Sequence, residues 1–247
     1  MHWNRLLYTL SLLTLCSWQA AAEDPYFCTT ADRVLYYERY LAGSDSLLQN
    51  TTISVGAVDS SDTGRRVHYG FEMKKADGRA MLGGRTELVA RILPDGLVMT
   101  DLYKGVQHFL RKLAPHVSVT SVGDPGIYPA RMQPGDTLPD SHSIIKVFLL
   151  KYRMSYTERR VLRQERLTTP AGTYDCVVIR EHRKERGLLN KVDLWLDSWY
   201  ARGVGAVRHD YYNKRMKLEE SEILISNEQA PLTAPLLPKT ADQVRGN

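Results

Sequence analysis

The sequence lacks the short motifs that mark most catalytic and metal sites. Gly-x-Ser-x-Gly and His-Glu-x-x-His are both absent. Ser143 and Lys146 match a Ser-x-x-Lys pattern, but the stretch between them is strand-like, which directs the two side chains to opposite faces. The histidines of the main domain show no ligand spacing: His68, His108, His116, His142, His182 and His209. We therefore expect no catalytic residue, no metal and no cofactor, and a protein that is not an enzyme.

Long apolar runs are also scarce, and the clearest one lies near the N-terminus. Arg5 precedes an apolar stretch over residues 6–15, and Ala20-Ala21-Ala22 supplies the small residues that a signal peptidase requires. The stretch is shorter than the roughly 20 residues that cross a bilayer. We predict that residues 1–22 are a cleaved signal peptide and that the protein is exported, to the periplasm or beyond. A retained anchor is the alternative, and Leu15 before Cys16 makes a poor lipoprotein signal.

Cysteine is rare, with three in the chain. Cleavage after Ala22 would leave Cys28 and Cys176. An oxidising compartment would allow these two to form a disulfide. They could equally be two buried thiols on neighbouring strands, because free cysteine packs as a small apolar side chain. The sequence leaves both possibilities open.

The charge is only mildly positive, with a formal net charge of +5. Basic residues concentrate between Arg153 and Arg186 but alternate with glutamates, which is typical of solvated strand faces. A nucleic-acid site would be a patch of one sign, so we expect no nucleic-acid partner. An anionic surface such as lipid headgroups stays open as a partner. Asp193 and Asp197 would share a strand face, where a solvated surface is favoured over an acid–base pair.

Most of the remaining sequence alternates with the period of two that β-strands have. It predicts one mainly β (α+β) domain over residues 23–226, built on a strongly twisted antiparallel sheet or half-barrel. Leu102, Val106, Phe109, Leu110 and Leu113 recur at helical spacing, which predicts one covering helix over 101–113, started by Thr100 or Asp101. That helix could be a lid or simply a cover. Residues 227–247 contain three prolines without periodicity and are predicted to be disordered.

We expect strands at 33–41, 53–58, 65–73, 86–93 and 97–100, followed after the helix by a loop over 123–139. Further strands are expected at 144–157, 158–167, 173–183, 191–199, 206–212 and 218–225. The segment 33–41 is largely apolar on both sides, which suggests a strand with protein or ligand on both sides, or a short helix.

Three stretches carry a resemblance to a known family. They are Tyr128-Pro129 followed by Pro134-Gly135-Asp136-Thr137-Leu138-Pro139-Asp140; Thr168-Thr169-Pro170-Ala171-Gly172-Thr173-Tyr174-Asp175-Cys176; and Trp199-Tyr200-Ala201-Arg202-Gly203-Val204-Gly205-Ala206-Val207-Arg208. With these stretches in this order, the chain resembles the TapB-like family of exported bacterial proteins over roughly residues 26–225. That family looks related to a broader group of envelope β domains. The resemblance implies a β-rich envelope domain and supplies no catalytic residues. Physically, Pro170 and Gly172 suit a tight turn.

Aromatic residues are more numerous than one sheet face needs. We expect them on the inner surface of the curved sheet, where they would bind an apolar or amphipathic ligand or a partner protein. The candidate ligand-binding residues are Tyr36, Tyr40, Tyr69, Phe71, Trp195, Trp199 and Tyr200. A structural or assembly subunit of an envelope complex is the alternative, and an enzyme of hydrolase type comes third. Ser46 and Thr137 lie in Asp-Ser-Leu and Asp-Thr-Leu patterns that resemble O-glycosylation acceptors.

Overall fold

The computed structural model describes residues 23–81, 83–187 and 191–230, which form thirteen strands and one helix. The elements before the loop at 129–140 are β1 (Arg33–Leu41), β2 (Leu47–Ser61), β3 (Gly64–Lys75), β4 (Thr86–Ile92), β5 (Val98–Thr100), α1 (Leu102–Leu113), β6 (Val119–Gly123) and β7 (Gly126–Tyr128). Those after it are β8 (Ser141–Val147), β9 (Leu150–Thr169), β10 (Gly172–Arg186), β11 (Lys191–Ala201), β12 (Gly205–Tyr212) and β13 (Leu218–Gln229). The chain is therefore mainly β, as predicted.

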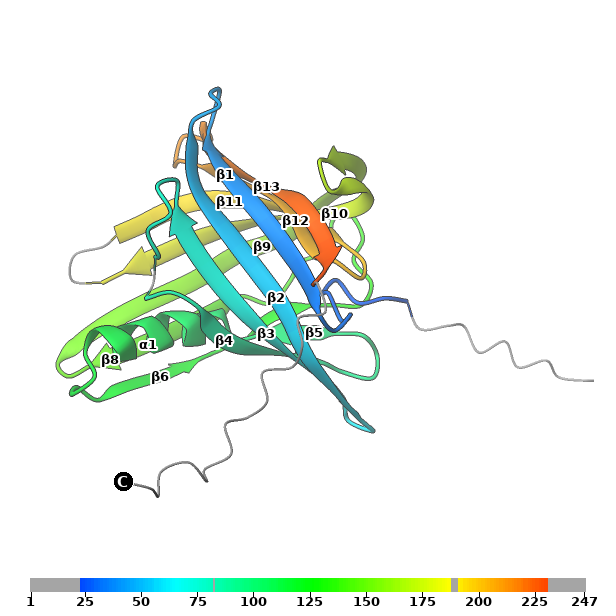
Figure 1. Ribbon diagram of the computed structural model, residues 1–247. Coiled ribbons are helices and arrows are strands. Elements are labelled where there is room, and N and C mark those ends of the chain that lie inside the picture. Colours follow the sequence, from blue (N-terminus) through cyan, green and yellow to red (C-terminus); the bar gives the residue numbers. More distant parts are fainter. Residues whose placement is uncertain (1–22, 82, 188–190, 231–247) are drawn as a thin grey trace, which may run out of the picture.

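All thirteen strands belong to one antiparallel sheet with the order β6-β8-β9-β10-β11-β12-β13-β1-β2-β3-β4-β5-β7. The runs β8 to β13 and β1 to β5 are meanders of successive hairpins, the connection that antiparallel strands make most easily. Pairing of β1 with β13 joins the two meanders, so the first and last strands lie side by side in the middle of the sheet. Figure 1 shows β1, β2 and β3 crossing steeply over β9, β10 and β11, as expected of a strongly twisted sheet.

The two ends of the sheet approach each other without closing into a barrel. The Arg159 guanidinium of β9 donates a hydrogen bond to the Ile127 carbonyl of β7, and the Ser141 hydroxyl of β8 donates to the Asp124 carbonyl. We call the face on which these ends meet the inner face. Residues paired across strands share a face, so the register places Tyr37 and Tyr69 on it. The main core lies mostly on this face and draws on both meanders, and it also includes Val178 and Trp199 of the opposite face.

Helix α1 spans the gap between the two ends of the sheet, where it contacts β4 on one side and β6 and β8 on the other. Its half-buried apolar side chains cover a small cluster formed by Val119, Ile145 and Met154. No residue of α1 is fully buried. Asp101 occupies the N-cap position as expected, but its side chain makes no capping hydrogen bond. The helix therefore covers the sheet through half-buried side chains and is not embedded in the core. No helix in the described residues is long and apolar enough to span a membrane.

The structure corrects three predicted boundaries. The hairpin turn expected near Thr157 lies instead at Phe148–Leu149, and β9 runs through Glu158, which is accommodated with a φ of 55°. Positive φ at this position bends the strand without ending it. Strand β13 continues to Gln229, so residues 227–229 are ordered by pairing with β1, contrary to the expected tail. The expected loop at 123–139 contains the short strand β7. Residues 1–22 and 231–247 lie outside the described residues.

Candidate functional site

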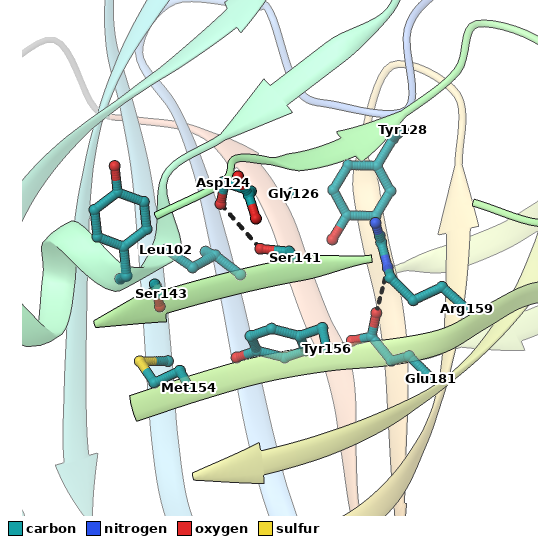
Figure 2. Close-up of a pocket in the computed structure, with 11 residues that line it drawn as sticks. Leu102, Asp124, Gly126, Tyr128, Ser141, Ser143, Met154, Tyr156, Arg159 and Glu181 are labelled. Atoms are coloured by element: carbon teal, nitrogen blue, oxygen red, sulfur yellow. Dashed lines mark hydrogen bonds and ion pairs between the residues drawn. The ribbon is translucent and has the colours of Figure 1, made fainter. Parts of the chain in front are cut away.

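A pocket lies on the inner face under the start of α1 (Figure 2). It is bounded by α1 and by the strands β7, β8, β9 and β10. Its lining residues are Leu102, Tyr103, Asp124, Gly126, Tyr128, Ser141, Ser143, Met154, Tyr156, Arg159 and Glu181. The volume open to the centre of a water molecule is about 20 Å³. That is room for about one water molecule, so the pocket as it stands is nearly closed.

The polar end of this interior pocket is built on a buried ion pair. The side chains of Arg159 and Glu181 are 1% and 7% exposed, and their Nε and Oε2 atoms lie 3.0 Å apart. Arg159 also donates to the carbonyls of Pro139 at 2.8 Å and Ile127 at 3.3 Å. A buried charge needs such partners, because removing it from water costs several kcal/mol. Burial raises the pKa of Glu181, and attraction to Arg159 only partly offsets this.

Tyrosines surround this ion pair. The Arg159 guanidinium lies 5.1 Å from the centre of the Tyr128 ring, and the Tyr200 hydroxyl donates to the Tyr128 hydroxyl at 3.1 Å. Burial raises the pKa of Tyr128, and it raises the pKa of Tyr156 to about 12. All of these phenols are therefore neutral hydrogen-bonding groups at physiological pH.

One buried polar atom beside the pocket has no partner. The Thr100 hydroxyl on β5 makes no hydrogen bond to any described residue. It faces Gly126, where an added Cβ would come within 3.0 Å of the hydroxyl oxygen. An unsatisfied buried hydroxyl costs about 1–3 kcal/mol. The hydroxyl lies close to Gly126, a lining residue, but Thr100 is not itself part of the pocket lining.

A second group of charges lies further along the inner face. Arg39 on β1 donates to the Tyr211 hydroxyl at 2.6 Å and to Glu222 at 3.3 Å, while its Nε atom is buried without a partner. Burial raises the pKa of Glu222, but Arg39 and the other partners outweigh it and hold the pKa below the ordinary value. Arg183 on β10 donates to Glu185. The inner face is thus more polar than the apolar surface that the sequence predicted.

The aromatic residues singled out from the sequence do not form one site. The register places Tyr69, Phe71 and Tyr200 on the inner face. The other four lie on the opposite, outer face: Tyr36, Tyr40, Trp195 and Trp199. The prediction of a single aromatic surface is therefore wrong, because the apolar alternation of β1 and β11 supplies both faces.

The aromatic side chains on the outer face contact neighbouring polar and charged groups. The Trp195 ring stacks on His182 at 4.4 Å, and Trp199 lies between the guanidinium groups of Arg163 and Arg208. Tyr40 donates to Glu38 and borders a shallow open groove of about 620 Å³ at the β1–β2 hairpin.

Arg159 and Glu181 were not identified from the sequence. Glu181 did carry a signal, since it follows the buried Val177 and Ile179 at a spacing of two. Arg159 carried none. The irregular pairing of β9 with β10 next to Glu158 changes which residues face inward, and a single sequence does not show where such a bulge falls.

The two main-domain cysteines are both buried and free, so the structure contains no bond between them. Burial raises the pKa of the Cys28 thiol, and burial together with nearby Glu165 raises that of Cys176 to about 12. Both are therefore protonated and unreactive at neutral pH. No cluster of potential metal ligands occurs among the described residues.

The remaining candidates fall at separate places. Asp193 pairs with His182 and Lys214, whereas Asp197 pairs with Arg180, so the two aspartates do not face each other as an acid and a base. Ser143 is buried on the inner face and Lys146 is exposed, which agrees with the predicted strand.

Both proposed glycosylation residues are accessible in the structure. Ser46 lies in the turn between β1 and β2, and Thr137 lies in the loop before β8; both are exposed. Whether either is modified stays a prediction.

Comparison with known proteins places this geometry in a family. The DUF3108-like family profile matches residues 41–224. Two solved structures share the fold, each with a TM-score of 0.67: a "putative lipoprotein" from Parabacteroides distasonis, 19% identical, and a "putative exported protein with YmcC-like fold" from Bacteroides fragilis, 21% identical. They cover 83% and 84% of this chain, which in turn covers 99% and 100% of theirs. No curated protein matches the chain significantly. The TapB-like resemblance is finer than these matches and stays a prediction.

Proposed function

Since this chain belongs to the DUF3108-like family, we propose that it is an exported, non-enzymatic protein of the cell envelope that binds an amphipathic molecule in the interior pocket. Two solved proteins of the same fold are named as exported or as a lipoprotein, which supports the export predicted from residues 1–22.

The observation that carries the proposal is the split lining of the pocket. Leu102 and Met154 line it with apolar surface, whereas Arg159 and the Ser141 hydroxyl, which already donate to backbone carbonyls, give it a polar end. Binding sites for small molecules combine these two features, with a few polar groups fixing the orientation of an otherwise apolar ligand.

The small volume of the pocket makes α1 a lid in this proposal. A ligand larger than a water molecule enters only if the helix moves away from the sheet. Such a movement exposes no fully buried side chain of α1 itself, but it uncovers part of the cluster of Val119, Ile145 and Met154. It would break the hydrogen bonds from Lys112 to the Gly83 and Arg85 carbonyls and from Gln107 to the Val119 carbonyl.

The test uses a fluorescent fatty acid as a probe. Ser143→Val places a larger, apolar side chain at the pocket wall and is expected to weaken probe binding at least ten-fold. Lys112→Ala releases one attachment of the lid and is expected to speed probe association. Ser221→Val, which borders the outer groove, is the matched control and should bind as the unaltered protein does.

The proposal fails if the probe does not bind, or if Ser143→Val and Ser221→Val behave alike while both remain folded by circular dichroism. Native mass spectrometry of protein taken from the envelope provides a second readout. A protein that is always empty would also count against a ligand.

A specific observation favours a second function, docking of a partner protein. Strand β6 lies at one end of the strand order. Hydrogen bonds from Gln107 and Arg111 of α1 to the Val119 carbonyl occupy the start of this strand, whereas Val122 further along it is 67% exposed. An extended segment of another chain could add to such an edge, as would a structural subunit of an envelope complex. Crosslinking in cells followed by purification tests this, and a chain that crosslinks to nothing would exclude it.

The arrangement nearest to an enzyme site supports the non-enzymatic proposal. The Ser198 hydroxyl lies 2.7 Å from His209 Nδ1, but Ser198 is only 1% exposed and sits in the middle of the sheet. A substrate could not reach that hydroxyl unless the side chains that cover the face around it moved aside. A hydrolase is therefore the least favoured of the three functions.

A further inference from the structure

The hairpin that joins β8 to β9 carries a group of exposed apolar side chains. Phe148, Leu149 and Leu150 are 79%, 81% and 47% exposed, and we call these three the apolar tip. The Phe148 amide donates to the Ser118 carbonyl, so the segment that follows α1, with exposed Val117, lies against the tip.

An apolar tip of this kind is unusual on a protein surface. Hairpin turns favour glycine, asparagine, aspartate and serine, and Phe148 adopts a φ of 53° that a bulky residue rarely takes. Three successive exposed apolar residues gain nothing from folding and favour aggregation unless something covers them. The tip therefore suits an interaction outside the described chain.

Cations surround the tip. Five exposed basic residues lie at this end of four neighbouring strands: Lys146, Lys151, Arg153, Arg186 and Lys191. The register sets Lys146 opposite Lys151, and Arg186 opposite both Arg153 and Lys191. None of the five forms an ion pair with another described residue. Like charges placed directly opposite each other destabilise a sheet, so this arrangement has a cost in stability that no described partner offsets.

Two acidic side chains of the described residues lie near these strand ends, and neither offsets the five cations. Asp193 on the outer face pairs with His182 and Lys214. The other is Glu185. It is buried on the inner face, where it accepts hydrogen bonds from Tyr152 and Arg183. The outer face at this end of the sheet thus carries an excess of positive charge beside an apolar projection.

We propose that this end of the sheet docks on a lipid bilayer with anionic headgroups. The apolar tip enters the boundary between headgroups and acyl chains, and the five cations contact the lipid phosphates. The shape favours a bilayer over a protein partner, because the apolar residues project from a hairpin and are not spread over a flat or hollow face. Apolar insertion flanked by lysine and arginine is how peripheral proteins bind anionic membranes. The inference goes beyond the interior pocket and does not depend on it.

The test measures binding of the exported protein to vesicles of phosphatidylglycerol and phosphatidylcholine in equal parts, with phosphatidylcholine vesicles for comparison. We expect binding to the anionic vesicles that weakens as salt is added. Each lysine or arginine near an anionic surface contributes about five-fold to the binding constant, so Lys146→Gln with Lys151→Gln should weaken binding about 25-fold. Phe148→Ser with Leu149→Ser should weaken it at least as much.

Matched controls separate a local surface from overall charge. Arg66→Gln with Arg91→Gln removes another pair of cations that face each other across strands, away from the tip. Leu41→Ser removes an exposed leucine at the β1–β2 hairpin. Both control variants should bind vesicles as the unaltered protein does. Any contribution from the N-terminal segment is common to all variants.

A direct readout is a tryptophan placed at the tip by Phe148→Trp. Lipids with brominated acyl chains should quench its fluorescence, whereas they should not quench a tryptophan placed by Leu41→Trp. The proposal is overturned if the protein does not bind anionic vesicles, or if the control variants lose as much binding as the tip variants. It is also overturned if the tip crosslinks to a protein in cells and makes no contribution to vesicle binding.

Discussion

Replacing Arg159 by methionine should destabilise the protein more than almost any other single change. The substitution keeps an unbranched side chain of similar length but removes the partner of Glu181 and the donors to the Pro139 and Ile127 carbonyls. Those contacts hold β7, the 129–140 loop and β10 together. Breaking a buried ion pair from one side costs about 3–5 kcal/mol, because the remaining charge stays buried alone.

The loss should depend on pH with a definite sign. Burial already raises the pKa of Glu181, and removing Arg159 raises it further. A carboxyl with a raised pKa in the folded state destabilises that state as pH rises above its unfolded value. The difference in unfolding free energy between Arg159→Met and the unaltered protein should therefore increase between about pH 5 and about pH 8, by about 1.4 kcal/mol for each unit of pKa change.

Urea unfolding followed by tryptophan fluorescence measures both quantities, and the double variant Arg159→Met with Glu181→Leu supplies the control. Removing both charges should recover part of the lost stability and abolish the added pH dependence. The reasoning would be refuted if the single variant lost less than about 1 kcal/mol, or if the two substitutions were simply additive.

Three further predictions concern other parts of the fold. Burial lowers the pKa of His209, so the unaltered protein should lose stability as pH falls below 6.5, and His209→Gln should lose less over that range in urea unfolding at several pH values. Cys28 and Cys176 should react with a thiol reagent only in denaturant, and mass spectrometry showing a disulfide in the native protein would contradict the structure. Gly64→Ala should cost about 1–3 kcal/mol, because φ is 118° and the new Cβ would lie 2.1 Å from the Ile92 carbonyl oxygen; an unchanged thermal midpoint would exclude that conformation.

The helix and most strands could be predicted because their signals are local. Helical spacing of apolar residues placed α1 within a residue of its observed bounds. Alternation located most of the long strands, although Lys151 to Thr157 was wrongly separated from the rest of β9. A bulge and a turn both interrupt alternation, and they differ only in whether the chain reverses, which depends on pairing with distant strands.

The candidate site could be predicted only in part. The sequence correctly identified a surplus of aromatic residues but not the face on which each one lies. In β1, for example, Tyr36 and Tyr37 are adjacent and point to opposite faces, and either could have belonged to the core. The pairing of β1 with β2 and β13 decides which of the two tyrosines is inside. The β1–β13 pairing joins residues nearly 200 positions apart, such as Arg33 and Gln229.

The fold class follows from local pattern, because the period of two that buries one side of a strand is present in consecutive residues. The amino-acid composition likewise sets how many charged and aromatic groups are available. Where these groups meet depends on the pairing of distant strands. The curl of the sheet brings β7 against β9 and so encloses Arg159 with Glu181, and it aligns the ends of four strands so that scattered lysines and arginines become one surface around Phe148. Both results depend on register and twist, which are properties of many strands together and are not written in any one of them.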